Sequence, residues 1–99
     1  MTKDEIIELY RRAIKDWGVP AQIKMMYEEG GELITALAQF DRGRNTIEDV
    51  ATEIADVMVV CEQLALIFGE ELVQEKYDYK IERLKERLDK FEKEHGTEG

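Results

Sequence analysis

The sequence is poor in residue types that many active sites require, since it contains one cysteine, one histidine and one proline. The lone cysteine, Cys61, cannot form a disulfide within the chain, and its apolar surroundings favour a small core residue over a nucleophile. The lone histidine, His95, lies in the expected C-terminal tail. A Ser-His-Asp triad, a Cys-His pair and a di-iron bundle with two Glu-x-x-His motifs are therefore excluded.

Long apolar runs and strand patterns are also missing. The longest apolar region, residues 54–68, is interrupted by Asp56, Glu62 and Gln63 and is too short to cross a bilayer. No segment alternates apolar and polar residues with a period of two, so a glycine-rich phosphate loop after a strand is not expected. The first residues lack the apolar stretch of a signal peptide. We expect a soluble protein in a reduced, cytoplasmic setting, with no membrane partner.

Positive charge is scarce as well: 14 basic residues stand against 23 acidic ones, which gives a formal net charge of −9. A protein that binds a nucleic acid polymer needs a basic surface to neutralise phosphates, so we expect no such partner. A single nucleotide with a bound cation stays compatible with this charge. A chain of 99 residues suffices for one domain with a modest core, which we expect at residues 1–99, with a disordered tail at 95–99.

Helix signals recur along the whole chain and predict an all-α fold, an antiparallel bundle of about four helices. The first is expected at residues 3–17, where Thr2 and Glu5 have capping-box spacing and Gly18 ends the helix. The second has Pro20 in its first turn and reaches about residue 40. The third follows the cap Thr46 and ends near residue 68, and the fourth covers about residues 70–94.

The third and fourth predicted helices carry more apolar surface than one small chain can cover. The third is apolar nearly all the way round between residues 54 and 68, as is typical of a helix that is buried on all sides. The fourth carries a stripe with nearly coiled-coil spacing, formed by Val73, Tyr77, Ile81, Leu84, Leu88 and Phe91. We therefore expect oligomerisation through apolar helix faces, into a homodimer or homotetramer.

Two acidic pairs share the same internal spacing: Glu29 with Glu32, and Glu53 with Asp56. Residues three apart lie on one face of a helix, so each pair projects two carboxylates in one direction. If the two helices pack face to face, four negative charges converge and a cation is needed between them. Ligands that are all oxygen favour a hard cation, Mg²⁺ first and Mn²⁺ or Ca²⁺ after it.

The two pairs differ in how strongly their own surroundings support a site. A solvated helix face is the ordinary explanation of an acidic residue in this charged chain, but Glu53 and Asp56 lie among apolar residues. The first pair encloses Gly30 and Gly31, which fit either a loop between two helices or a continuous helix with glycines at a tight approach. Glu28 and Asp49, each four residues before a pair member, are second-rank ligands.

Both pairs belong to a longer pattern. Its residues are Trp17-Gly18, Gln22, Glu28-Glu29-Gly30-Gly31-Glu32-Leu33, Ala36-Leu37 and Glu53-Ile54-Ala55-Asp56-Val57. This pattern, an E-x-x-E followed by an E-x-x-D on consecutive helices, resembles the MazG-like superfamily of all-α nucleoside triphosphate pyrophosphohydrolases. The resemblance covers about residues 17–69.

The resemblance implies hydrolysis of a nucleoside triphosphate between its α and β phosphates, with Mg²⁺ as cofactor and protomers that form dimers or tetramers. Glu29, Glu32, Glu53 and Asp56 would hold the metal, and Glu29 or Glu32 would orient the attacking water as general base. The chain departs from the family farther on, where many members carry a Lys and a later Asn near a Tyr-Pro. This chain has Lys80-Ile81-Glu82-Arg83-Leu84 there, without that Asn or proline. Position 60, often aromatic in relatives, is valine here.

Four residues are candidates for binding the substrate. Lys80 and Arg83 are expected to meet phosphate oxygens, the alternative being solvated positions of a coiled coil. Trp17 and Gln22 are expected to stack on or hydrogen-bond the nucleobase, the alternative for Trp17 being a core position. Two other functions stay open, a non-hydrolytic metal- or nucleotide-binding regulator and a helical oligomerisation module.

Overall fold

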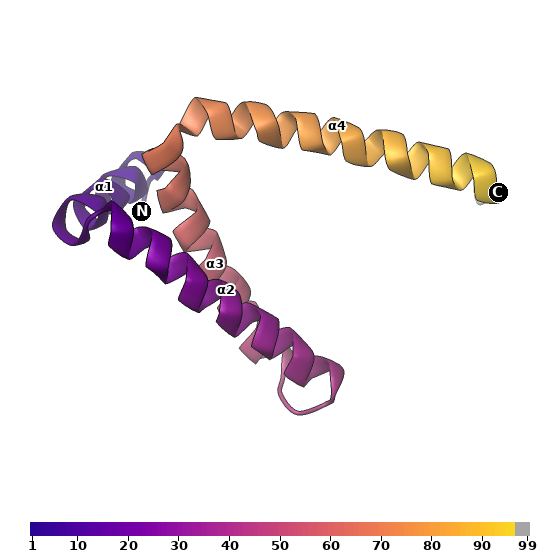
Figure 1. Ribbon diagram of the computed structural model, residues 1–99, viewed down its shortest axis with the longest axis horizontal. Coiled ribbons are helices and arrows are strands. Elements are labelled where there is room, and N and C mark those ends of the chain that lie inside the picture. The colour runs from indigo at the N-terminus through magenta and orange to yellow at the C-terminus, as the bar shows by residue number, and fades with distance from the viewer. Residues whose placement is uncertain (97–99) are drawn as a thin grey trace. The chain divides into compact units, whose positions relative to one another are not determined.

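The computed structural model describes residues 1–96 and confirms the all-α prediction. Four helices follow one another in the chain (Figure 1), and no strand occurs within the described residues. They are α1 (Lys3–Trp17), α2 (Val19–Asp41), α3 (Ile47–Phe68) and α4 (Glu70–His95). Two compact units share these helices, Met1–Ile67 with α1, α2 and nearly all of α3, and Phe68–Gly99 with α4. A single domain built as one four-helix bundle stays a prediction.

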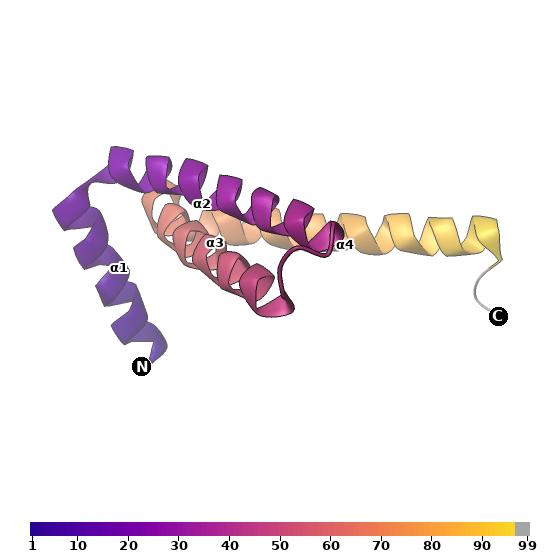
Figure 2. The ribbon, with the colours of Figure 1, turned by 90° about the horizontal axis from the view of Figure 1, so that it is seen from below.

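Local capping explains why the helices begin and end near the predicted residues. At the start of α1, the Glu5 backbone N–H donates to Thr2 Oγ1 at 3.2 Å, and the Thr2 N–H donates to Glu5 Oε1 at 2.9 Å. Thr46 and Asp49 make the same reciprocal pair before α3. Gly18, at φ +89°, turns the chain sharply between α1 and α2 (Figure 2).

The glycine pair within the acidic motif is helical, which decides between the two interpretations of the sequence. Residues 30 and 31 lie inside the unbroken helix α2. A Cβ added at Gly31 would meet no atom within 4 Å, and one at Gly30 would lie 3.7 Å from the Met26 sulfur. The first acidic pair therefore lies on one helical face, and no close approach to another described residue requires glycine at these two positions.

Replacing Gly31 by alanine is expected to raise the thermal midpoint of unfolding. Glycine in a helix interior costs about 1 kcal/mol relative to alanine, which corresponds to about 4–8 °C in a domain of this size. Gly18→Ala is the matched comparison, because its positive φ strains any side chain and the midpoint should fall. Circular dichroism melting measures both. A lower midpoint for Gly31→Ala would mean that a Cβ at this position meets something outside the chain.

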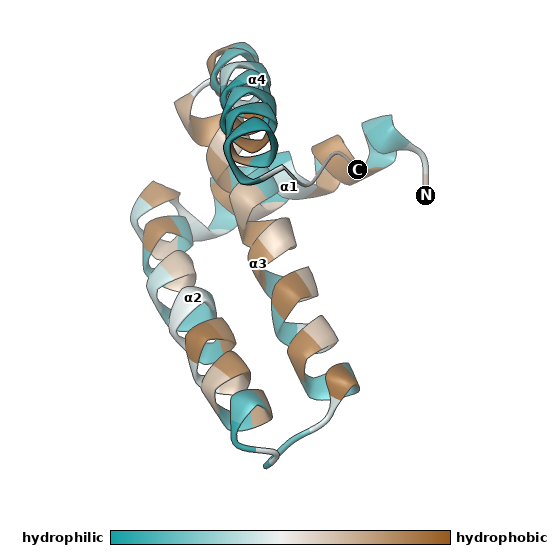
Figure 3. Cartoon of the chain, turned by 90° about the vertical axis from the view of Figure 1, so that its right-hand side faces the viewer, coloured by the Kyte–Doolittle hydropathy of each residue, from teal (hydrophilic) through white to brown (hydrophobic). Residues whose placement is uncertain are grey.

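Helices α2 and α3 run side by side in opposite directions (Figure 3). The loop between them is fixed by Asn45, whose side-chain amide donates to the Ala36 carbonyl at 3.0 Å. Four of the described residues are buried, and all of them lie on these two helices: Gln22, Ala36, Val60 and Gln63. Two of the four are glutamines, so the best-buried positions of α2 and α3 are unusually polar.

Helix α4 forms its unit alone and leaves its apolar stripe exposed. All six stripe residues are at least 43% exposed: Val73, Tyr77, Ile81, Leu84, Leu88 and Phe91. The helix ends with His95 stacked on Phe91 at a centroid distance of 4.0 Å, and Gly96 adopts the left-handed conformation after it. The rest of the predicted tail, residues 97–99, lies outside the described residues. Within residues 1–96, no helix combines the length and apolar character needed to span a membrane.

Candidate functional site

The two acidic pairs come together where α2 and α3 face each other. Glu29 and Glu32 lie one turn apart on α2, and Glu53 and Asp56 lie one turn apart on α3. One carboxylate oxygen from each of the four residues lies within 4.8 Å of the others. The predicted ligand set is therefore one cluster, which we call the carboxylate cluster.

Two members of the carboxylate cluster are held partly away from water. Glu29 and Glu53 are half-buried, and the Oε2 atom of each is buried without a hydrogen-bond partner within residues 1–96. Burial raises the pKa of both carboxyl groups above 4.5, and the charges of Glu32 and Asp56 raise it further. Unpaired buried acceptors are costly, so these oxygens are better suited to a bound cation than to the protein alone.

No basic side chain neutralises this concentration of charge within the described part of the chain. The ion pair found among residues 1–96 joins Lys85 and Asp89, on α4. The donor set consists of carboxylate oxygens, without nitrogen or sulfur, and such sets suit hard cations such as Mg²⁺ and Mn²⁺. The arrangement can hold a metal, and the choice of Mg²⁺ stays a prediction.

An open groove of about 600 Å³ lies beside the carboxylate cluster, between α2 and α3. Its size falls within the range of small-molecule sites. Most of the residues that line it have polar side chains. The lining consists of Glu28, Gly31, Glu32, Thr35, Ala36, Gln39, Asn45, Asp49, Thr52 and Glu53. Both second-rank ligand candidates line it, but the Asp49 carboxylate already accepts hydrogen bonds from the N–H and the hydroxyl of Thr46. Asp49 therefore serves first as the cap of α3.

The four predicted substrate-binding residues lie in very different surroundings. Gln22 is only 1% exposed and neither polar atom of its side chain has a hydrogen-bond partner, whereas Trp17 is 65% exposed. Lys80 and Arg83 belong to the second unit, where both associate with Tyr79. Arg83 Nη1 donates to the Tyr79 hydroxyl at 3.3 Å. Their contact with phosphate stays a prediction.

Sequence reasoning missed two polar residues of the α2–α3 hairpin. Asn45 lines the groove, and its Oδ1 atom is buried without a partner. Gln63 is 8% exposed, and its Oε1 atom is likewise unpartnered. A signal for Gln63 existed: it stands seven residues after Asp56, two helical turns along the same face. Such a position inside an apolar run is expected to be buried.

Comparison with known proteins yields no relative: no family model, no curated protein and no solved structure matches this chain. The resemblance to MazG-like enzymes therefore rests on the motif residues alone and stays a prediction.

Proposed function

We propose that this protein is a Mg²⁺-dependent hydrolase that converts nucleoside triphosphates, with ribose or deoxyribose, to the monophosphate and pyrophosphate. The convergence of four carboxylates from α2 and α3 within 4.8 Å carries the proposal. A site of this kind binds an anionic substrate only together with a metal, which reconciles the acidic chain with a triphosphate. Removal of unwanted nucleotides from the cellular pool would suit such an activity.

The residues of the cluster fit a divalent cation. The buried, unpartnered Oε2 atoms of Glu29 and Glu53 are ready acceptors, and Glu32 and Asp56 complete an all-oxygen ligand set. A bound Mg²⁺ would supply charge neutralisation for the phosphoryl oxygens and acidify the attacking water. Glu29 or Glu32 would orient that water and accept its proton, because both carboxylates project from α2 into the cluster. Lys80 and Arg83 would contact phosphate oxygens.

The proposal is tested by incubating the purified protein with each common nucleoside triphosphate and with oxidised and methylated analogues. Each reaction is run with Mg²⁺, with Mn²⁺ and with a chelator, and products are separated by anion exchange. Equal amounts of monophosphate and pyrophosphate, formed only with metal, are expected. Release of inorganic phosphate and a diphosphate would contradict cleavage between the α and β phosphates, and no turnover of any substrate would contradict the enzyme.

One observation favours a second function. The apolar stripe of α4 is exposed along its whole length, as expected of a helical oligomerisation module. A regulator that binds a nucleotide without hydrolysing it would keep the carboxylate cluster and differ in the region from Lys80 to Leu84. The two functions differ in the fate of the nucleotide. Saturable Mg²⁺-dependent binding in calorimetry, without product in the assay above, would favour the regulator. The carboxylate cluster favours the enzyme, because a module that only associates has no use for four converging acids.

We expect the chain to associate with itself as a homodimer or homotetramer. Besides the α4 stripe, α2 and α3 expose Tyr27, Ile34 and Met58 at 57–72%, which is more apolar surface than a stable monomer usually leaves in water. Sedimentation equilibrium should show a mass above 11.5 kDa that falls on dilution. Leu84→Lys with Leu88→Lys should weaken association, and Glu86→Lys on the same helix is the control. A strictly monomeric wild type at micromolar concentration would rule association out.

A further inference from the structure

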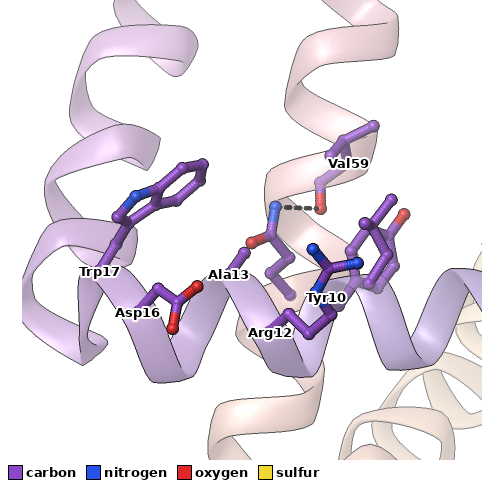
Figure 4. Close-up of a pocket in the computed structure, with 8 residues that line it drawn as sticks. Tyr10, Arg12, Ala13, Asp16, Trp17 and Val59 are labelled. Carbon is purple, nitrogen blue, oxygen red and sulfur yellow. Dashed lines mark hydrogen bonds between the residues drawn. The ribbon is translucent and has the colours of Figure 1, made fainter.

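A second cavity lies between α1 and α3, and its walls combine apolar and polar groups. Its volume is about 350 Å³, near the lower limit of small-molecule sites. Leu9, Trp17 and Val59 supply apolar surface, and Arg12, Asp16 and Gln63 supply polar groups (Figure 4). All of these residues belong to the first unit. An apolar cavity with a few converging polar groups is the usual form of a site for a small organic ring.

Gln63 is the observation that points to a ligand. Its side chain is 92% buried, and its Nε2 atom makes only a long hydrogen bond of 3.5 Å to the Val59 carbonyl (Figure 4). Its Oε1 atom is buried and has no hydrogen-bond partner among the residues that the structure describes. A buried acceptor without a donor is costly to the folded protein. An N–H group of a ligand in the cavity would satisfy this oxygen.

The other polar groups at the cavity differ in whether they are already engaged. The Tyr10 hydroxyl donates to Glu62, and burial together with this bond raises the pKa of Tyr10 to about 12. Tyr10 therefore holds α1 against α3. Arg12 and Asp16, one turn apart on α1, form no ion pair within the described residues, so the guanidinium and the carboxylate remain available. The cavity thus presents two acceptors and one donor.

Trp17 gives the cavity an aromatic wall. Its indole lies at the cavity and is 65% exposed, a large cost for an apolar ring that nothing covers (Figure 4). Indole rings stack on heterocyclic bases, and such stacking contributes on the order of 1–3 kcal/mol per base. Together with Gln63 and Asp16, the indole matches a planar ring that carries N–H donors on its edge.

The cavity and the carboxylate cluster are close enough for one nucleotide to bind both, with its base in the cavity and its phosphates at the cluster. Gln63 follows Asp56 by two helical turns, about 10 Å along α3. The groove between α2 and α3 has no aromatic residue and four acidic ones, so it suits phosphates with their cation better than a base. The cavity supplies the aromatic surface, Trp17, that the groove lacks.

We propose that the cavity between α1 and α3 binds the heterocyclic base of the substrate, with Trp17 stacking on the ring and Gln63 and Asp16 accepting hydrogen bonds from its edge. The proposal rests on the proposed function for the phosphate end. It assigns the choice among bases to Gln63 and Asp16, with Arg12 as a donor to ring oxygen or nitrogen. A base with amino or imino hydrogens should therefore bind better than one without them.

The intrinsic fluorescence of Trp17 tests the proposal, because the chain has one tryptophan and every change in indole emission reports this residue. The full chain is titrated with free nucleosides, which lack phosphate, and with pyrophosphate plus Mg²⁺, which lacks a base. Nucleosides with exocyclic amino groups should quench the emission saturably, and pyrophosphate should not. Absence of saturable quenching by any nucleoside, at concentrations up to the solubility limit, would overturn the proposal.

Two variants examine the edge contacts. Gln63→Leu should weaken nucleoside binding at least tenfold while the midpoint of thermal unfolding stays the same or rises, because an unpartnered buried oxygen is removed. Asp16→Ala, at an exposed position, should weaken the binding of the same nucleosides. Glu8→Gln, an exposed acid of α1 outside the cavity, is the control and should bind normally. Unchanged quenching in both cavity variants would overturn the assignment even if nucleosides bind.

Failure of this inference can be told apart from failure of the proposed function. Asp56→Asn should lose hydrolysis and keep nucleoside quenching, because the base site does not need the metal. If the wild type hydrolyses triphosphates but nucleosides do not quench its tryptophan emission, the base site alone would be overturned. A wild type with saturable, Gln63-dependent quenching and no hydrolysis would support the base site and contradict the enzyme.

Discussion

Glu53→Gln and Asp56→Asn are each expected to lower Mg²⁺-dependent pyrophosphate release at least about 100-fold. Both substitutions keep the size of the side chain and remove the charge that holds the cation. Loss of groups that only support a metal ligand already costs 10–100-fold, so loss of a ligand should cost no less. Initial rates of pyrophosphate release at saturating triphosphate measure the effect.

The matched control is Glu48→Gln. Glu48 is an exposed acid in the first turn of the same helix and lies outside the carboxylate cluster. It should keep wild-type activity. Circular dichroism should show the same helix content in all three variants, since none of these side chains caps α3. Full activity of Glu53→Gln and Asp56→Asn would end the argument for a catalytic metal.

The helices and the common face of each acidic pair were predictable because both depend on short-range rules, whereas the meeting of the two pairs in one cluster also requires α2 and α3 to face each other. Thr2 with Glu5, and Thr46 with Asp49, fix helix starts through hydrogen bonds across three residues. The spacing of the acids fixes their common face wherever the helix forms. For the first acidic pair, the structure decided what the sequence left open: Gly31 is helical, and the pair therefore lies on one unbroken helix.

The burial of the two glutamines and the presence of the cavity were harder to predict from the sequence, because both depend on how the helices pack. Gln22 and Gln63 differ from solvated glutamines only by their position on a packed face, and that face is known once the helices are seen together. Gln63, for example, lies at the cavity between α1 and α3. Trp17 was weighed as a core residue, but it is mostly exposed at the cavity. For Lys80 and Arg83 no short-range rule relates α4 to the carboxylate cluster, so their part in binding stays a prediction.

The stability of the protein without metal should depend on pH through the carboxylate cluster. The pKa values of Glu29 and Glu53 are raised in the folded chain, mainly by burial. A carboxyl group with a raised pKa contributes stability that is fully present below its unfolded value of about 4.5. That contribution is lost as pH rises through the folded pKa. The metal-free protein should therefore lose stability from this site as the pH rises above about 4.5.

Mg²⁺ should reverse this loss, and the reversal should grow with pH, because the cation competes with protons for Glu29 and Glu53. At a tenfold excess over its dissociation constant, Mg²⁺ should raise the midpoint of unfolding by about 5–10 °C at pH 8. At pH 5 the rise should be clearly smaller. Differential scanning fluorimetry at constant ionic strength, adjusted with KCl, separates binding from screening.

Glu53→Gln is the most informative variant in this experiment, because it should raise the midpoint of unfolding without metal and reduce the shift that Mg²⁺ causes. Without metal at pH 8 the variant should melt at a higher temperature than the wild type, since one buried carboxylate is gone. With Mg²⁺ its midpoint should hardly move, since the ligand set is incomplete. A wild-type shift that is equal at pH 5 and pH 8, or a full shift in Glu53→Gln, would mean that Mg²⁺ acts elsewhere. The stabilisation by Mg²⁺ and the hydrolysis would then depend on different sites. If the carboxylate cluster holds the metal that performs hydrolysis, one substitution in it should abolish both the Mg²⁺-dependent rise of the midpoint and the hydrolysis.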